Sequence, residues 1–193
     1  MPKRPTPEAS AIYQLKITLL GSKPPIWRRV QVTETTTLHQ LHWIIQLTMG
    51  WTNSHLHQFE IGGVRYSQRD FGLEEVKDER RITLKVVIPG VVLGGKYRFI
   101  YEYDFGDGWE HEVTVEKRLA PEQEAHYPRC VAGKRACPPE DCGGVWGYEH
   151  FLEVINDEDD PEHEERLEWA GGSFDPEAFS VEEVNEALRE EFR

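Results

Sequence analysis

The stretch YRFIYEYDFGDGWEHEVTV, residues 97–115, decides the fold. Aromatic and apolar residues occupy every second position in both halves: Tyr97, Phe99, Tyr101, Tyr103, then Trp109, His111, Val113 and Val115. A period of two is typical of strands with one buried face. Between the halves, Asp104 to Gly108 supplies the aspartates and glycines that favour a tight turn. The stretch therefore predicts an antiparallel hairpin.

Similar alternation predicts further strands around this hairpin, at residues 13–19, 26–33, 55–61, 64–66 and 82–88. Leu38, Leu41, Ile45 and Met49 instead recur at helical spacing. Thr36 or Thr37 is the candidate N-cap of that helix, and Gly50 its stop. From Gly147 onward the pattern is helical again, with a capping box at Ser180. Strands first and helices last predict an α+β fold with a mainly antiparallel sheet, an early helix and a C-terminal acidic helical region.

Length and composition fit one domain. The chain has 193 residues, 38% of them hydrophobic and three of them cysteine. We predict a tail at residues 1–10 and a single domain at 11–193, with 149–193 as an acidic helical subregion. Because no apolar run approaches about 20 residues, no membrane span is expected. The start of the chain also lacks the apolar segment of a signal peptide, so we expect a soluble, cytoplasmic protein with reduced thiols.

Charge is distributed unevenly along the chain. Residues 1–148 carry 19 Lys and Arg against 18 Asp and Glu, whereas residues 149–193 carry 3 against 17. Such an acidic block repels phosphate backbones, which argues against nucleic acid as a partner. It could dock on a basic protein. The alternative is a solvated helical surface that aids solubility.

Four motifs in series resemble a known family. They are IWRR at 26–29, HLHQF at 55–59, YDFGDGWEH at 103–111 and CPPEDCGG at 137–144, followed by Gly147 and Tyr148. The chain resembles the Ri-plasmid open-reading-frame-three-like family of insertion-sequence passenger proteins, some of which bear the resolvase-like name TnpR. The resemblance implies an association with plasmids and mobile elements. It implies no activity and no functional residue.

DNA recombination does not fit the residues. A serine recombinase needs a nucleophilic serine with supporting arginines and a basic DNA-binding appendage, whereas this appendage is acidic. A tyrosine recombinase needs a basic clamp, and the first 148 residues have a net charge of only +1. The association with mobile elements therefore describes where the gene is found rather than what the protein does.

The three cysteines are candidate zinc ligands. Cys130, Cys137 and Cys142 fall within thirteen positions, in a predicted loop. Zinc prefers four ligands drawn from Cys and His, and binding would stabilise a loop with little core of its own. His111 is the first candidate for the fourth ligand, with His126 and His150 as alternatives. The competing interpretation is that the cysteines are small buried residues that pack the loop.

A second candidate site uses histidines and aspartates. His55 and His57 are predicted to share a strand face, and Asp104, Asp107 or His111 could complete a metal site with an open position for water. Such a site would make the protein a metal-dependent hydrolase. The alternative is that the histidines belong to the core and the two aspartates only shape a turn.

Other chemistries have weaker support. A nucleophilic Cys142 before a helix stays open. No phosphate-binding glycine loop occurs, so no nucleotide cofactor is expected. Rows of aromatic residues could instead line a binding groove, although aromatics at period two usually form the core. The sequence predicts a module that binds a ligand, a partner or a structural metal, with metal-dependent hydrolysis as the alternative.

Overall fold

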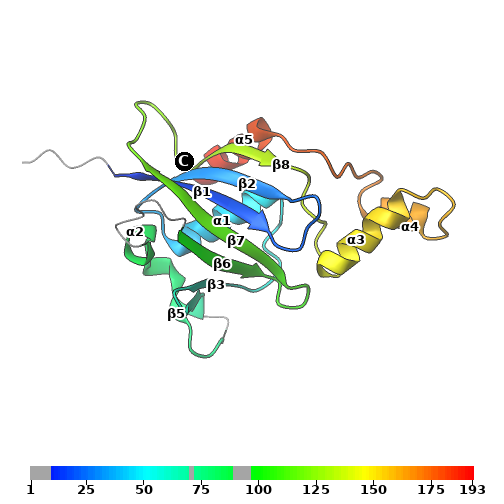
Figure 1. Ribbon diagram of the computed structural model, residues 1–193, viewed down its shortest axis with the longest axis horizontal. Helices are drawn as coiled ribbons and strands as arrows, with labels where there is room; N and C mark the ends of the chain where they lie inside the picture. Colours follow the sequence, from blue (N-terminus) through cyan, green and yellow to red (C-terminus); the bar gives the residue numbers. More distant parts are fainter. Residues whose placement is uncertain (1–9, 70–71, 89–96) are drawn as a thin grey trace, which may run out of the picture.

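Eight strands form one sheet in the computed structural model, which describes residues 10–69, 72–88 and 97–193 (Figure 1). The strands are β1 (Ile12–Leu19), β2 (Trp27–Thr33), β3 (His57–Ile61), β4 (Val64–Ser67), β5 (Lys77–Asp78), β6 (Tyr97–Tyr103), β7 (Trp109–Leu119) and β8 (Arg129–Lys134). Their spatial order is β5-β4-β3-β6-β7-β1-β2-β8. Only β4 and β5 pair in parallel, and the other neighbours are antiparallel. The predicted α+β fold is confirmed.

The predicted hairpin lies in the middle of this sheet. β6 pairs with β7 in the register that sets Tyr101 opposite His111 and Tyr103 opposite Trp109. All four of these side chains are fully buried. The alternation in the sequence therefore marks the buried face correctly, and the turn after Tyr103 is held at one edge of the core.

Helix α1 (Leu38–Met49) covers that buried face. Thr37 is its N-cap and forms a capping box with Gln40, while Gly50 ends the helix in the left-handed conformation. His42 and Gln46 on α1 both hydrogen-bond the Tyr101 hydroxyl of β6, at 2.8 and 3.0 Å. These bonds fix the helix against the centre of the sheet.

The opposite face of the sheet carries polar pairs. Arg29 on β2 donates to Glu116 on β7 at 2.7 Å, and Arg98 on β6 donates to Glu112 on β7 at 3.1 Å. An antiparallel sheet with one covered face and one solvated face requires the alternation seen in the sequence.

Two expectations for the segments after β4 are wrong. Residues 82–88 are not a strand: α2 (Leu84–Val87) is a single helical turn that follows the 3-10 helix η2 (Glu79–Arg81). Leu84 and Ile88 are buried while Val86 is 72% exposed, so the spacing that matters there is four. A short apolar run fits both periods, and sequence cannot separate them. Likewise, Cys130 lies on strand β8 rather than in a loop, opposite Val30 of β2.

Three helices follow the sheet, as predicted: α3 (Gly144–Ile155), α4 (His163–Trp169) and α5 (Val181–Glu191). α5 lies beside β8, where the Asn185 side chain bonds both backbone groups of Cys130. α3 and α4 lie together at the side of the sheet (Figure 1). None of the helices in the described ranges is long and apolar enough to cross a membrane. Residues 1–9, most of the predicted tail, lie outside the described residues.

Candidate metal-binding site

Asp104 directly follows β6, and one oxygen of its carboxylate faces His55. Asp104 has a positive φ of 55°, and its backbone N–H donates to Leu56 O at 2.8 Å. Its Oδ1 accepts from the Gly106 backbone N–H at 3.0 Å, an ordinary turn bond. The second oxygen, Oδ2, is left to face His55 at 3.7 Å.

His55 joins two carboxylates from distant parts of the chain. Its Nε2 lies 3.7 Å from Asp104 Oδ2 and 3.1 Å from Asp141 Oδ1. Nε2 is itself buried, yet it has no hydrogen-bond partner in the described part of the chain. One ligand atom from each of the three side chains lies within 4.8 Å of the others. We call these three residues the His55 cluster.

Asp141 reaches the cluster because glycines allow a close approach of two backbones. The Gly143 N–H donates to Asp107 Oδ2 at 3.1 Å, which ties the hairpin turn to the segment before α3. A Cβ on Gly144 would lie 2.4 Å from the Asp107 carbonyl oxygen, so that position has no room for a side chain. Asp107 thus positions the loop that carries Asp141 and does not belong to the cluster itself.

Aromatic residues support the same loop from below. Trp51 Nε1 donates to Pro138 O at 3.0 Å. The Tyr103 hydroxyl donates to Glu140 Oε1 at 2.5 Å and accepts from the Ser54 N–H at 2.9 Å. Burial, together with the Glu140 carboxylate, raises the pKa of Tyr103, so this hydroxyl keeps its proton. Ser54, which precedes His55, and Glu140, which precedes Asp141, are therefore both hydrogen-bonded to the Tyr103 hydroxyl.

The cluster is open to solvent on one side. The side chains of His55, Asp104 and Asp141 are 27%, 11% and 70% exposed. His55 and Asp104 also line a hollow of about 450 Å³ with Ser54, Gln68 and Phe105. A cation held by the three side chains would therefore be reachable by water or a small ligand.

His57 does not join this cluster, contrary to the prediction. β3 begins only at His57, so His55 precedes the strand and the two rings do not share a face. His57 is fully buried, its Nε2 lies 2.9 Å from Glu79 Oε2, and its ring stacks on His42 at 3.5 Å. Burial, with a smaller effect of His57, lowers the pKa of His42 to about 2. These rings belong to the core.

His111 is also a core residue. It is fully buried between aromatic rings, with Trp51 at 5.3 Å and Tyr101 at 5.5 Å between ring centroids. Burial lowers its pKa to about 4, so the ring is neutral near pH 7. Neither ring nitrogen has a side-chain partner in the described ranges.

The cysteines are not gathered around His111. Within residues 10–69, 72–88 and 97–193, the His55 cluster is the only group of three or more His, Cys, Asp or Glu side chains whose ligand atoms lie that close together. Burial raises the pKa of Cys130, Cys137 and Cys142, the last to about 12. Protonated thiols are poor nucleophiles. Zinc binding by cysteines stays a prediction that the geometry does not favour.

Asp141 is the site residue that sequence reasoning missed. It lies next to Cys142 in a motif that drew attention to sulfur ligands, and it lies 37 positions after Asp104 in the chain. The one usable signal was the glycine pair that follows it, because adjacent glycines often mark a close backbone approach.

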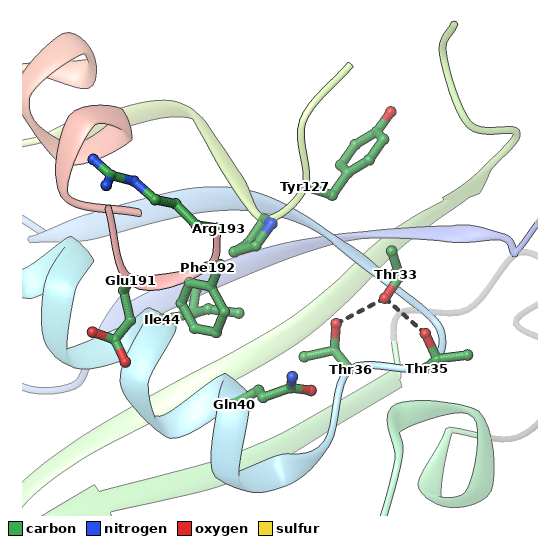
Figure 2. A pocket seen from close by; sticks show the side chains of 10 residues that line it. Thr33, Thr35, Thr36, Gln40, Ile44, Tyr127, Glu191, Phe192 and Arg193 are labelled. Atoms are coloured by element: carbon green, nitrogen blue, oxygen red, sulfur yellow. Dashed lines mark hydrogen bonds between the residues drawn. The ribbon is translucent and has the colours of Figure 1, made fainter. Parts of the chain in front are cut away.

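A second hollow of about 410 Å³ lies between the turn after β2 and the C-terminal residues (Figure 2). The Thr33 hydroxyl bonds those of Thr35 and Thr36 at 3.0 and 3.1 Å on one wall. Phe192 and the oppositely charged Glu191 and Arg193 form another. This wall composition offers neither a metal-ligand set nor an acid–base pair, so the His55 cluster is the stronger candidate.

Comparisons with known proteins agree with the resemblance in the sequence. The model of the plasmid pRiA4b ORF-3-like protein family matches residues 11–183. The uncharacterized protein y4hQ of Sinorhizobium fredii is 38% identical over 186 residues, which cover 93% of this chain and 91% of that protein. A crystal structure of MM3350 from Methanosarcina mazei Go1, described as a protein of unknown function, is 40% identical with a TM-score of 0.82. It covers 91% of this chain and 98% of that one.

Proposed function

We propose a function from the geometry of the site. The chain belongs to the plasmid pRiA4b ORF-3-like family, and the descriptions of the two relatives above state no activity that could serve as a guide. The proposed function is binding of one divalent transition-metal cation, with zinc as the first choice. The ligands are His55 Nε2, Asp104 Oδ2 and Asp141 Oδ1.

The spacing of these three atoms carries the proposal. Zinc binds histidine nitrogen and carboxylate oxygen at about 2.0–2.2 Å, so ligands around one ion lie roughly 3–4 Å apart. The two separations from His55 Nε2, 3.1 and 3.7 Å, fall in that range. The nitrogen also makes no hydrogen bond to either carboxylate. Its lone pair would therefore be available to a cation.

The donor set supports a transition metal over calcium. One imidazole with two carboxylates suits zinc or manganese, whereas calcium takes six to eight oxygen ligands. Two carboxylates and a neutral imidazole would also balance the charge of a divalent ion.

Metal binding can be tested on tag-free protein dialysed against zinc and analysed for its metal content. The wild type should hold about one zinc per chain, and His55→Ala or Asp104→Asn should lose it. His150→Ala removes an exposed imidazole from α3 and serves as the matched control, which should keep the metal. Zinc that survives His55→Ala but is lost in Cys137→Ser would overturn the proposal in favour of the cysteines.

Hydrolysis is a second candidate function, supported by the hollow of about 450 Å³ beside His55 and Asp104. Three protein ligands leave a coordination position for water, and a bound metal lowers the pKa of that water toward 7. The zinc-loaded protein should then cleave bis(p-nitrophenyl) phosphate or p-nitrophenyl acetate, and Asp104→Asn should abolish the cleavage. A stoichiometric zinc complex without either activity would leave binding intact and exclude hydrolysis of these esters.

A further inference from the structure

Helices α3 and α4 form a strongly acidic unit, which we call the α3–α4 lobe (residues 144–170). It contains ten Asp and Glu residues against a single basic residue, Arg166, which gives a net charge of −9. Residues 1–143 have a net charge of +1, so the negative charge begins with this lobe. Such a field attracts cationic groups and repels phosphates.

The lobe also exposes a large aromatic side chain. Trp146 on α3 is 83% exposed, whereas Tyr148, Phe151 and Val154 on the same helix are buried. His150 and Glu153 follow Trp146 at spacings of four and seven, so they share its outward face, and Glu149 lies beside them. An indole flanked by carboxylates is therefore presented to solvent.

Another tryptophan of the chain shows what Trp146 lacks. Trp27 on β2 is covered by two cations, with Lys16 Nζ and the Arg29 guanidinium carbon each 5.1 Å from its ring centre. No lysine or arginine in the described part of the chain lies over Trp146 in this way. A cation over an exposed indole is a favourable contact, and it is stronger where water is excluded.

We infer that the outer face of α3 is a docking surface for a basic polypeptide segment, with a Lys or Arg side chain of the partner over the Trp146 indole. Neighbouring cations of the segment pair with Glu149 and Glu153. The surplus of negative charge in the lobe selects this partner class, and tryptophan is among the residues that dominate binding energy at interfaces. This surface uses none of the three residues of the His55 cluster and does not depend on a metal.

Fluorescence anisotropy with a labelled oligo-arginine peptide tests the inference at near-physiological salt. The wild type should bind the peptide, and Trp146→Ala should weaken binding about fivefold through loss of the cation–π contact. The double variant Glu149→Gln/Glu153→Gln should weaken it at least as much. Because the Trp146 side chain is exposed, Trp146→Ala should fold as the wild type does, and circular dichroism checks this.

The matched control makes the same change of charge on α5, with Glu186→Gln/Glu190→Gln, and should bind within about twofold of the wild type. Equal weakening by the α3 and α5 pairs, with no effect of Trp146→Ala, would show long-range attraction without a docking face and overturn the inference. Absence of wild-type binding would overturn it as well. So would self-association of the chain that Trp146→Ala abolishes, because the occupant would then be a second copy.

Discussion

His55 and His57 lie two residues apart in one motif, yet they have opposite surroundings. The His57 side chain is fully buried against Glu79, while that of His55 is 27% exposed between two aspartates. The difference arises because β3 begins at His57, so only that ring follows the sheet into the core. Residue type therefore does not decide the role here. A metal ligand needs a donor atom that no hydrogen bond occupies, beside other ligands and near solvent. Nε2 of His55 has no hydrogen-bond partner in the described residues, and the His55 side chain lines the hollow of about 450 Å³.

The first way to test this contrast is acidification, which acts on the core histidines. The pKa of His42 is about 2 and that of His111 about 4 in the folded protein, both below the ordinary 6.5 because of burial. Above about pH 4 both rings are neutral in the folded protein, whereas in the unfolded chain they take up protons below pH 6.5. The contribution of these two rings to the free energy of unfolding is therefore fully present above pH 6.5, and it decreases as the pH falls toward 4.

From pH 7 to pH 5, the two rings together should lower the free energy of unfolding by about 4 kcal/mol. Urea unfolding at several pH values measures this loss, and His111→Phe isolates one ring from the carboxylates that also titrate. The variant should lose about 2 kcal/mol less than the wild type over that range. Identical pH profiles would show that His111 is not a neutral core residue.

Removing the core carboxylate should have the next largest effect. Glu79 is fully buried and lies 2.9 Å from His57 Nε2 and 3.1 Å from His39 Nδ1. Glu79→Ala should lower the free energy of unfolding by about 3 kcal/mol, because breaking a buried hydrogen-bonded pair is costly. His55→Ala should cost less than about 1 kcal/mol. If the two variants are equally stable in urea, the contrast between the buried Glu79 pair and the His55 cluster fails.

The sequence predicted the framework better than the site. Alternation of aromatic residues identifies the central hairpin, because burial on one face of a strand dictates a period of two. The helix cap and the stop at Gly50 are local signals: the sequence placed the cap at Thr36 or Thr37, and the structure has it at Thr37. The His55 cluster is different, since Asp141 meets Asp104 only through a backbone approach at Gly144 that no local pattern encodes. Periodicity also misled the placement of His55, which lies outside the strand.

Gly144 offers a test of how the loop that carries Asp141 is positioned. A Cβ there would meet the Asp107 carbonyl oxygen at 2.4 Å, and the φ of +69° is already unfavourable for alanine. Gly144→Ala should cost about 2 kcal/mol and weaken zinc binding, because the loop of Asp141 must move. Gly172→Ala is the control: its φ is +96° with nothing within 4 Å, so it should cost about 1 kcal/mol and leave zinc binding unchanged. Equal zinc affinity in both would refute this account of the loop.

Two tyrosines on β6 provide the test with the smallest expected effects on stability and zinc affinity. Tyr101 bonds His42 and Gln46 inside the core, whereas Tyr103 bonds Glu140 and the Ser54 backbone beside the cluster. Tyr101→Phe should cost about 2 kcal/mol without changing zinc affinity, because it leaves buried groups unsatisfied.

Tyr103→Phe should cost about 1 kcal/mol and lower zinc affinity a few-fold, because the Glu140 segment loses an anchor. Calorimetric titration with zinc and urea unfolding measure both quantities on the same samples. A larger loss of zinc affinity in Tyr101→Phe than in Tyr103→Phe would contradict the proposed division between the core and the His55 cluster.

Anomalous X-ray diffraction at the zinc edge, from crystals of the tag-free protein grown with zinc, tests the central claim most directly. A single strong peak should lie about 2 Å from His55 Nε2 and from one oxygen of each of Asp104 and Asp141. A peak bounded by Cys130, Cys137 or Cys142, or no peak at the His55 cluster under saturating zinc, would contradict the account.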